Sequence, residues 1–319
     1  MAHDTATPDT ATMAASSVDE ADGLVDRYRR ASIRFGDLVH LIRDEQWDLP
    51  TPCVDWTVRD LLNHVAAENL WTVPLLEGRT IAEVGTAYDG DVLGADPVAA
   101  SADAAAAARS AVGAEGAVER TVHLSFGDTA AEEYLQQLLA DHLLHGWDLA
   151  QAIGVEDRLD PDLVDAVASW FTTVEDGYRQ AGAIGARAAV APDADAQARL
   201  LARFGRSGAL AAVGRFNAAF ARRDVEAVMV QMTDDCVFDT TAPAPDGQRY
   251  EGRDEVAAAW RELFAASPTM HFDTEEIVGA DDRVVVRWTY SWGDGHVRGI
   301  DVLRVRDGLV AEKLSYVKG

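Results

Sequence analysis

The sequence predicts a two-domain protein in which an all-α helical bundle precedes an α+β domain. A length of 319 residues suggests two domains, at roughly 150 residues per domain. Up to about residue 182 the apolar residues recur mainly at helical spacing, whereas from residue 271 onward apolar and polar residues alternate as they do in strands. Helices followed by a run of strands are typical of an α+β domain.

Charge and composition exclude several classes of protein. The chain has 28 Lys and Arg against 54 Asp and Glu, a formal net charge of −26. Binding to nucleic acid or to an anionic membrane needs a basic surface, so we expect neither partner. No apolar run approaches the roughly 18 residues of a membrane helix, and the N-terminus lacks the pattern of a secretion signal, which predicts a cytoplasmic protein. The two cysteines, Cys53 and Cys236, form no CxxC motif, and we expect both to be buried.

The expected elements follow the chain in order. Residues 1–19 are mostly Ala, Thr, Asp and Ser and predict a disordered leader, because they offer little apolar surface to bury. The bundle is expected over residues 20–182, with helices from Leu24 to Ile42, from Thr57, over 98–112, over 130–153 and from Asp160, and a short strand at 121–126. Residues 183–206 mix Gly, Ala, Asp and Pro, which indicates a linker with room for a short helix.

The second domain is expected over residues 207–319. Helices are predicted between Ser207 and Met232 and at 254–264, and strands at 237–240, 271–278, 283–292, 296–306 and 309–317. Short turns rich in Asp and Gly separate the last four strands, which predicts an antiparallel meander.

Polar residues interrupt the apolar face of the helix at 130–153. Asp141, His145 and Asp148 follow one another at steps of four and three, so they share one helix face with Leu138 and Leu149. Buried carboxylates and imidazoles are costly when unpaired, and a shared cation relieves both at once. The pattern therefore predicts a cation site on this face.

A third ligand comes from the helix that begins at Thr57. With His64, the set becomes two imidazoles and the Asp141 carboxylate with a vacant position, which is the arrangement of catalytic zinc. Asp148 would orient His145 through its second ring nitrogen. The alternative is that His145 and Asp148 form a surface pair and that His64 is a hydrogen-bonded core histidine.

Two motifs carry a family resemblance. The segment from Trp47 to His64, which includes Leu-Pro-Thr-Pro-Cys53, and the segment His145-Gly-Trp-Asp148-Leu-Ala resemble the DinB-like superfamily. Within it they are similar to the metal-binding domain of mycothiol-dependent maleylpyruvate isomerase. The resemblance spans residues 20–182 and implies a four-helix bundle that holds a divalent metal, for which zinc suits the donor set.

The resemblance also implies metal ligands and a cofactor. The ligands map to His64, Asp141 and His145. Asp141 stands where Glu is more usual, so His142 is an alternative ligand. In such proteins the metal activates the thiol of mycothiol or a similar small thiol for attack on an electrophile, because a bound cation lowers the pKa of a thiol.

Residues 207–319 resemble the SnoaL-like branch of the nuclear transport factor 2 superfamily. The resemblance rests on the segments Arg215–Asp224, Asp234–Asp239, Tyr250–Asp254 and Arg298–Gly308. It implies an α+β cone in which a curved antiparallel sheet wraps around helices and encloses an apolar pocket. Relatives include polyketide cyclases, steroid isomerases and structural modules, so the fold alone does not decide the function.

Asp301 is the main catalytic candidate of this second domain. Strand alternation places it on one face with Leu303 and Val305, where burial would raise its pKa toward the range of a general base. Asp239 is a weaker candidate. The alternative for Asp301 is an ion pair with a neighbouring basic side chain that rigidifies the sheet. Trp260, Trp288 and Trp292 either line a pocket or fill the core.

The other face of the same strand carries Ile300 and Val302, which predicts a homodimer through the sheet or docking on the bundle. Three functions remain open at this point. The first is a metal-dependent transferase or isomerase that uses a mycothiol-like thiol on a small electrophilic substrate. The second is a cyclase or isomerase that uses Asp301 as general base without metal. The third is a small-molecule-binding protein without enzymatic activity.

Overall fold

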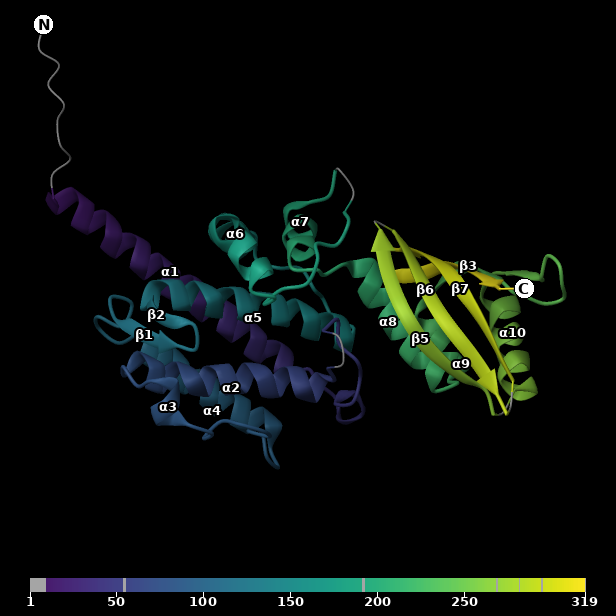
Figure 1. Cartoon of the computed structure of the whole chain (residues 1–319), viewed down its shortest axis with the longest axis horizontal. Coiled ribbons are helices and arrows are strands. Elements are labelled where there is room, and N and C mark those ends of the chain that lie inside the picture. The colour runs from purple at the N-terminus through teal and green to yellow at the C-terminus, as the bar shows by residue number, and fades with distance from the viewer. Residues whose placement is uncertain are drawn as a thin grey trace, which may run out of the picture. The chain divides into compact units, whose positions relative to one another are not determined.

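The computed structural model describes residues 10–53, 56–190, 193–267, 269–280, 282–293 and 295–318. The chain divides into two compact units (Figure 1). The first comprises residues up to Asp48 together with Thr57–Thr172, and the second comprises Leu49–Trp56 together with Thr173–Gly319. None of the described helices combines the length and the apolar character that a membrane span requires.

Four long helices form the first unit. Helix α1 packs against α5 and α2 packs against α4, with further contacts of α1 with α4 and of α2 with α5. These helices are α1 (Thr10–Val39), α2 (Val58–Leu76), α4 (Pro97–Val112) and α5 (Ala131–Ile153). The short elements of this unit are η1 (Asp44–Gln46), α3 (Ile81–Val84), β1 (Thr121–Leu124) and β2 (Gly127–Ala130). The arrangement confirms the helical bundle expected from the sequence.

The helix that carries His64 begins at a capping box. The Thr57 hydroxyl accepts a hydrogen bond from the Asp60 backbone, and the Asp60 carboxylate accepts one from the Thr57 backbone at 2.9 Å. Helix α5 ends at Gly154, whose φ of 72° is left-handed and is available to glycine without strain. These two signals fix the ends of the helices that supply the predicted ligands.

Several predicted boundaries differ from the structure. Residues 1–9 of the expected leader lie outside the described residues, and α1 begins at Thr10, so residues 10–19 extend the first helix. The strand expected at 121–126 is a hairpin of β1 and β2. The expected linker carries α7 (Ala196–Arg203), and α6 (Pro161–Gln180) contains the point at which the two units divide. The domain limits drawn from the sequence stay a prediction.

The second unit is a six-stranded sheet with helices on one face (Figure 1). Its helices are α8 (Gly208–Ala221), α9 (Val225–Val230) and α10 (Arg253–Ala266). Its strands are β3 (Met232–Asp239), β4 (Arg249–Glu251), β5 (His271–Ala280), β6 (Arg283–Trp292), β7 (Gly295–Arg306) and β8 (Leu309–Val317). The strand order is β4-β3-β8-β7-β6-β5, and only β3 and β8 pair in parallel.

The expected meander of β5 to β8 is confirmed, whereas β4 and the parallel pair were not predicted. Helix α8 packs against β5 to β8, and α10 packs against β3 and β4. Phe216, Trp260 and Leu303 are among the buried residues of the core between helices and sheet. Gly299 allows one close approach in this core, because a Cβ there would lie 2.5 Å from the Trp288 ring.

Candidate functional site

Helices α2 and α5 bring the three predicted metal ligands together. The Nε2 atoms of His64 and His145 lie 3.4 and 3.2 Å from the same oxygen, Oδ1 of Asp141. The three ligand atoms all lie within 4.8 Å of one another. The three side chains therefore lie together, although His64 is on a different helix from Asp141 and His145, as the sequence predicted.

Asp148 fixes the second nitrogen of His145. Its carboxylate is fully buried and lies 3.0 Å from Nδ1, which makes Nδ1–H the donor. In the neutral ring the lone pair of Nε2 then points at Oδ1 of Asp141. A nitrogen lone pair facing a carboxylate oxygen is repulsive unless a proton or a cation lies between them. The position between His145 and Asp141 thus favours a positive charge.

The spacing of the donor atoms fits a tetrahedral ion. Zinc binds imidazole nitrogen and carboxylate oxygen at about 2.0–2.1 Å, so neighbouring ligand atoms in a tetrahedral site lie about 3.3 Å apart. The separations of 3.4 and 3.2 Å agree with this value. Oδ2 of Asp141 is buried without a hydrogen-bond partner among the described residues. Although an Asp side chain is shorter than that of Glu, the carboxylate of Asp141 still lies next to both imidazoles.

The charges of this cluster act on one another. Burial alone would raise the pKa of Asp141, but the neighbouring imidazoles of His145 and His64 hold it well below its usual range. Glu68 lies one helical turn after His64 and is half-buried. Burial and the nearby charge of Asp141 raise the pKa of Glu68. Glu68 was missed in the sequence, although its spacing of four from His64 was a usable signal.

His142 does not take the place of Asp141. Its Nδ1–H donates to the Leu138 carbonyl at 2.8 Å, and its ring stands edge-on against Tyr28 and Phe35 of α1, with centroids 5.4 and 6.1 Å away. Burial lowers the pKa of His142. The ring therefore faces α1, whereas Asp141 faces His64 on α2.

Asp301 is buried in the second unit, as strand alternation predicted, with 6% of its surface exposed. Lys313 of β8 lies against it, with Nζ 2.8 Å from Oδ2, and the Ser315 hydroxyl donates to Oδ1 at 2.7 Å. The Lys313 ammonium also lies 5.3 Å from the Phe238 ring and 5.8 Å from the Trp260 ring. Asp301 therefore forms an ion pair with a basic neighbour, which was the alternative to its being an unpaired general base.

Asp239 lies apart from this pair. It is half-buried, and its carboxylate is 3.8 Å from Arg249 of β4. Its neighbour Phe238 faces Lys313, so strand alternation turns Asp239 to the opposite face of the sheet. The two catalytic candidates of this unit therefore do not form one site.

The expected aromatic and cysteine positions are partly confirmed. Trp260 and Trp288 are buried, and the indole N–H of each lacks a hydrogen-bond partner among the described residues. Trp292 is 41% exposed and does not belong to the core. Cys236 is buried as expected, but Cys53 is only half-buried.

Comparison with known proteins agrees with these two folds. Residues 28–150 match the model of the mycothiol maleylpyruvate isomerase N-terminal domain, and residues 213–313 match the model of the SnoaL-like domain. The chain is a fusion of these two domains. An uncharacterized protein from two strains of Mycobacterium tuberculosis is 33% identical to the chain over 159 residues, which covers 49% of this chain and 81% of that protein.

Solved structures are similar to part of the chain. One is a nuclear transport factor 2-like protein of unknown function from Mesorhizobium loti, with 35% identity, coverage of 41% of this chain and 99% of that chain, and a TM-score of 0.34. Another is a steroid delta-isomerase from Pseudomonas aeruginosa, with 19% identity, coverage of 36% and 82%, and a TM-score of 0.31. The cluster of His64, Asp141 and His145 lies within the first matched segment, residues 28–150, and the pair of Asp301 and Lys313 lies within the second, residues 213–313.

Proposed function

We propose that the chain is a metal-dependent transferase or isomerase that uses mycothiol or a similar small thiol on a small electrophilic substrate. One observation carries this proposal: the Nε2 atoms of His64 and His145 converge on a single oxygen of Asp141. Asp148 holds His145 in the tautomer that binds a metal. The match of this domain to the mycothiol maleylpyruvate isomerase family supports the thiol as co-substrate.

The chain's own residues have separate tasks in this site. A divalent ion bound there would offer the thiol a vacant coordination position and would lower the pKa of the thiol. Asp141 contributes negative charge and the imidazoles contribute neutral nitrogen donors, which suits zinc. The Asp148 carboxylate accepts a hydrogen bond from Nδ1–H of His145 and so leaves the Nε2 lone pair available to a metal.

The SnoaL-like domain is proposed to bind substrate or to dimerise. The contact between Lys313 and Asp301 supports an ion pair that organises the interior of the domain. Both carboxylate oxygens of Asp301 are already engaged, Oδ2 by the Lys313 ammonium and Oδ1 by the Ser315 hydroxyl, which leaves neither oxygen open to a substrate. Chemistry at Asp301 without a metal is therefore the less favoured assignment.

Metal content is the first test. Elemental analysis of untagged protein should find about one divalent ion per chain, and zinc is the metal that we expect. His64→Ala and His145→Ala should each lose stoichiometric metal while helical circular dichroism is unchanged. His123→Ala is the matched control, since His123 pairs with Asp128 on the hairpin and lies outside the cluster. Full metal content in both cluster variants would refute the site.

Thiol dependence is the second test. With mycothiol and maleylpyruvate as probes, turnover should require the thiol, stop with a chelator and return on addition of zinc. Asp301→Asn should retain activity per folded molecule. Turnover without thiol or metal that Asp301→Asn abolishes would move the chemistry to the SnoaL-like domain.

A further inference from the structure

Glu68 lies beside the cluster of His64, Asp141 and His145, and the protein does not neutralise its charge. It follows His64 by four residues, so the two side chains share one face of α2 and are one helical turn apart. The charges of Asp141, His64 and His145 act on its carboxyl group. Among the described residues, no Arg or Lys pairs with this carboxyl group and no side chain donates a hydrogen bond to it.

The cluster is open to solvent on the side where Glu68 lies. The side chains of His64 and Asp141 are 30% and 26% exposed, whereas that of His145 is only 9% exposed. A ligand therefore reaches the cluster past His64 and Asp141. Glu68 shares the helix face of His64 and is itself half-buried. The groups next to a metal-bound sulfur would thus come close to the Glu68 carboxylate.

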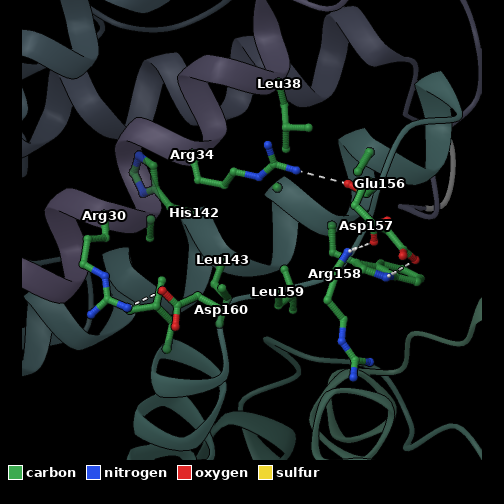
Figure 2. A pocket seen from close by; sticks show the side chains of 15 residues that line it. Arg30, Arg34, Leu38, His142, Leu143, Glu156, Asp157, Arg158, Leu159 and Asp160 are labelled. Atoms are coloured by element: carbon green, nitrogen blue, oxygen red, sulfur yellow. Dashed lines mark hydrogen bonds and ion pairs between the residues drawn. The ribbon is translucent and has the colours of Figure 1, made fainter.

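The arginines around α5 lie on its opposite side. Arg30, Arg34 and Arg158 line a cavity that is formed with α1 and with the segment before α6 (Figure 2). Acidic side chains share this lining, among them Asp160, which pairs with Arg30. The cavity is on the side of α5 that faces α1, whereas the cluster faces α2. These guanidinium groups therefore leave the charge of Glu68 uncompensated.

The balance of charge favours one kind of ligand at this site. A bound divalent ion would favour the ionised form of Glu68, because an opposite charge nearby stabilises a carboxylate. Asp141 and Glu68 together would balance the two positive charges of the ion, and a bound thiolate adds one negative charge in excess. A carboxylate near the sulfur would add a second negative charge and be repelled, whereas an ammonium group would cancel the first.

We propose that Glu68 determines which thiols the site accepts. It favours an ammonium group over a neutral group beside the sulfur, and it disfavours a carboxylate there. This inference rests on the proposed metal-dependent thiol chemistry and names the class of co-substrate for the same site. Glu68 does not belong to the donor set of His64, Asp141 and His145, so it acts through its charge.

Cobalt reports the binding of a thiol without any turnover. The metal of the full chain is removed with a chelator and replaced by Co²⁺, whose thiolate complexes have a ligand-to-metal charge-transfer band. Titrations with cysteamine, 2-mercaptoethanol and 3-mercaptopropionate compare a positive, a neutral and a negative group near the sulfur. Each affinity is expressed relative to that of 2-mercaptoethanol in the same protein. Comparison of these relative affinities between wild type and variant cancels the intrinsic differences in thiol pKa.

Glu68→Gln keeps the shape of the side chain and removes its charge. On the relative scale, we expect the variant to bind 3-mercaptopropionate about tenfold more tightly than the wild type does, and cysteamine about tenfold more weakly. Glu77→Gln is the control, because Glu77 is exposed at the C-terminal end of the same helix. It should leave the relative affinities unchanged.

Failure of this inference is distinguishable from failure of the proposed function. Equal relative affinities in the wild type and in Glu68→Gln, with cobalt and thiols bound to both, would overturn the role of Glu68 alone. A protein that binds no cobalt, or whose bound cobalt shows no thiolate band, would contradict the proposed function and this inference with it.

Discussion

Asp148 determines how the imidazole of His145 is oriented and protonated. An Asp148→Asn substitution keeps the shape of the side chain but removes the charge that holds the Nδ1 proton. We expect metal affinity to fall by about 10–100-fold, the usual effect of losing such a partner. Competition with a chromophoric chelator measures it. Asp128→Asn is the control, since it changes an exposed carboxylate that lies 2.7 Å from His123. Unchanged affinity in Asp148→Asn would contradict the role of Asp148.

Lys313 should be a strong determinant of stability in the SnoaL-like domain. Lys313→Met leaves the buried Asp301 carboxylate without its cation, which costs about 3–5 kcal/mol of unfolding free energy. The double variant Lys313→Met with Asp301→Leu should recover much of this loss, because no buried charge is then left unpaired. Urea unfolding of the three proteins checks the prediction, with Lys318→Met as an exposed control. A single variant as stable as the wild type would refute it.

The sequence predicted the cluster of His64, Asp141 and His145 better than it predicted the contact of Lys313 with Asp301. His64, Asp141 and His145 lie on two helices, where spacing alone decides which residues share a face. Lys313 meets Asp301 only because β7 and β8 pair in one particular register, with Asp301 opposite Ser315. Register depends on residues far apart in the chain, and a lone lysine in a strand gives no sign of burial.

At the scale of elements, one buried acid ties the end of α6 to the segment that contains α7. Glu175 accepts hydrogen bonds at 2.6, 2.6 and 2.9 Å from Arg179, Arg187 and Arg203. Burial by itself would raise the pKa of Glu175, but these three guanidinium groups outweigh burial and lower it to about 2. The segment predicted to be a linker is therefore anchored to the preceding helix.

This cluster gives a defined pH dependence. The pKa of Glu175 is lower in the folded protein than the usual value of about 4.3, so the carboxylate stabilises the fold at neutral pH. The contribution is present above about pH 5 and is lost as the pH falls toward 2. Glu175→Gln should lower the unfolding free energy by about 2–3 kcal/mol at pH 7, and the difference from wild type should shrink toward pH 2. Urea unfolding of both proteins at both pH values measures this difference in unfolding free energy. A difference that does not change with pH would contradict the prediction.

The elements themselves were predictable where local signals decide them. The capping box at Thr57 and the glycine after α5 are local, and the predicted ends of those helices agree with the structure. Strand β4 has three residues and joins the sheet only through β3, and the parallel pairing of β3 with β8 links distant segments. Neither feature has a local signal, which is why the sequence did not reveal them.

At the scale of the whole molecule, the outer face of the sheet predicts a homodimer. Val285, Ile300 and Tyr316 are 37%, 37% and 54% exposed on three adjacent strands of this face. Apolar side chains that are exposed side by side on a sheet often have a partner. Ile300→Glu should convert the protein to a monomer, as measured by light scattering after gel filtration. Val230→Glu on α9 replaces an apolar side chain that lies off the sheet and is even more exposed, at 64%, and it should leave the dimer intact. A wild-type monomer would refute the prediction.

The last of the six strands to be synthesised occupies the middle of the sheet. β8 lies between β3 and β7, and its ladder joins segments as distant as Met232 and Val310. Until the ribosome has delivered residues 309–317, β7 has an open edge and the ladder of β3 and β4 is separate from the meander. Such long-range pairing is slow because loop-closure entropy opposes it. That interval of translation is when an unpaired strand edge invites aggregation, and when a chaperone would protect the nascent chain most.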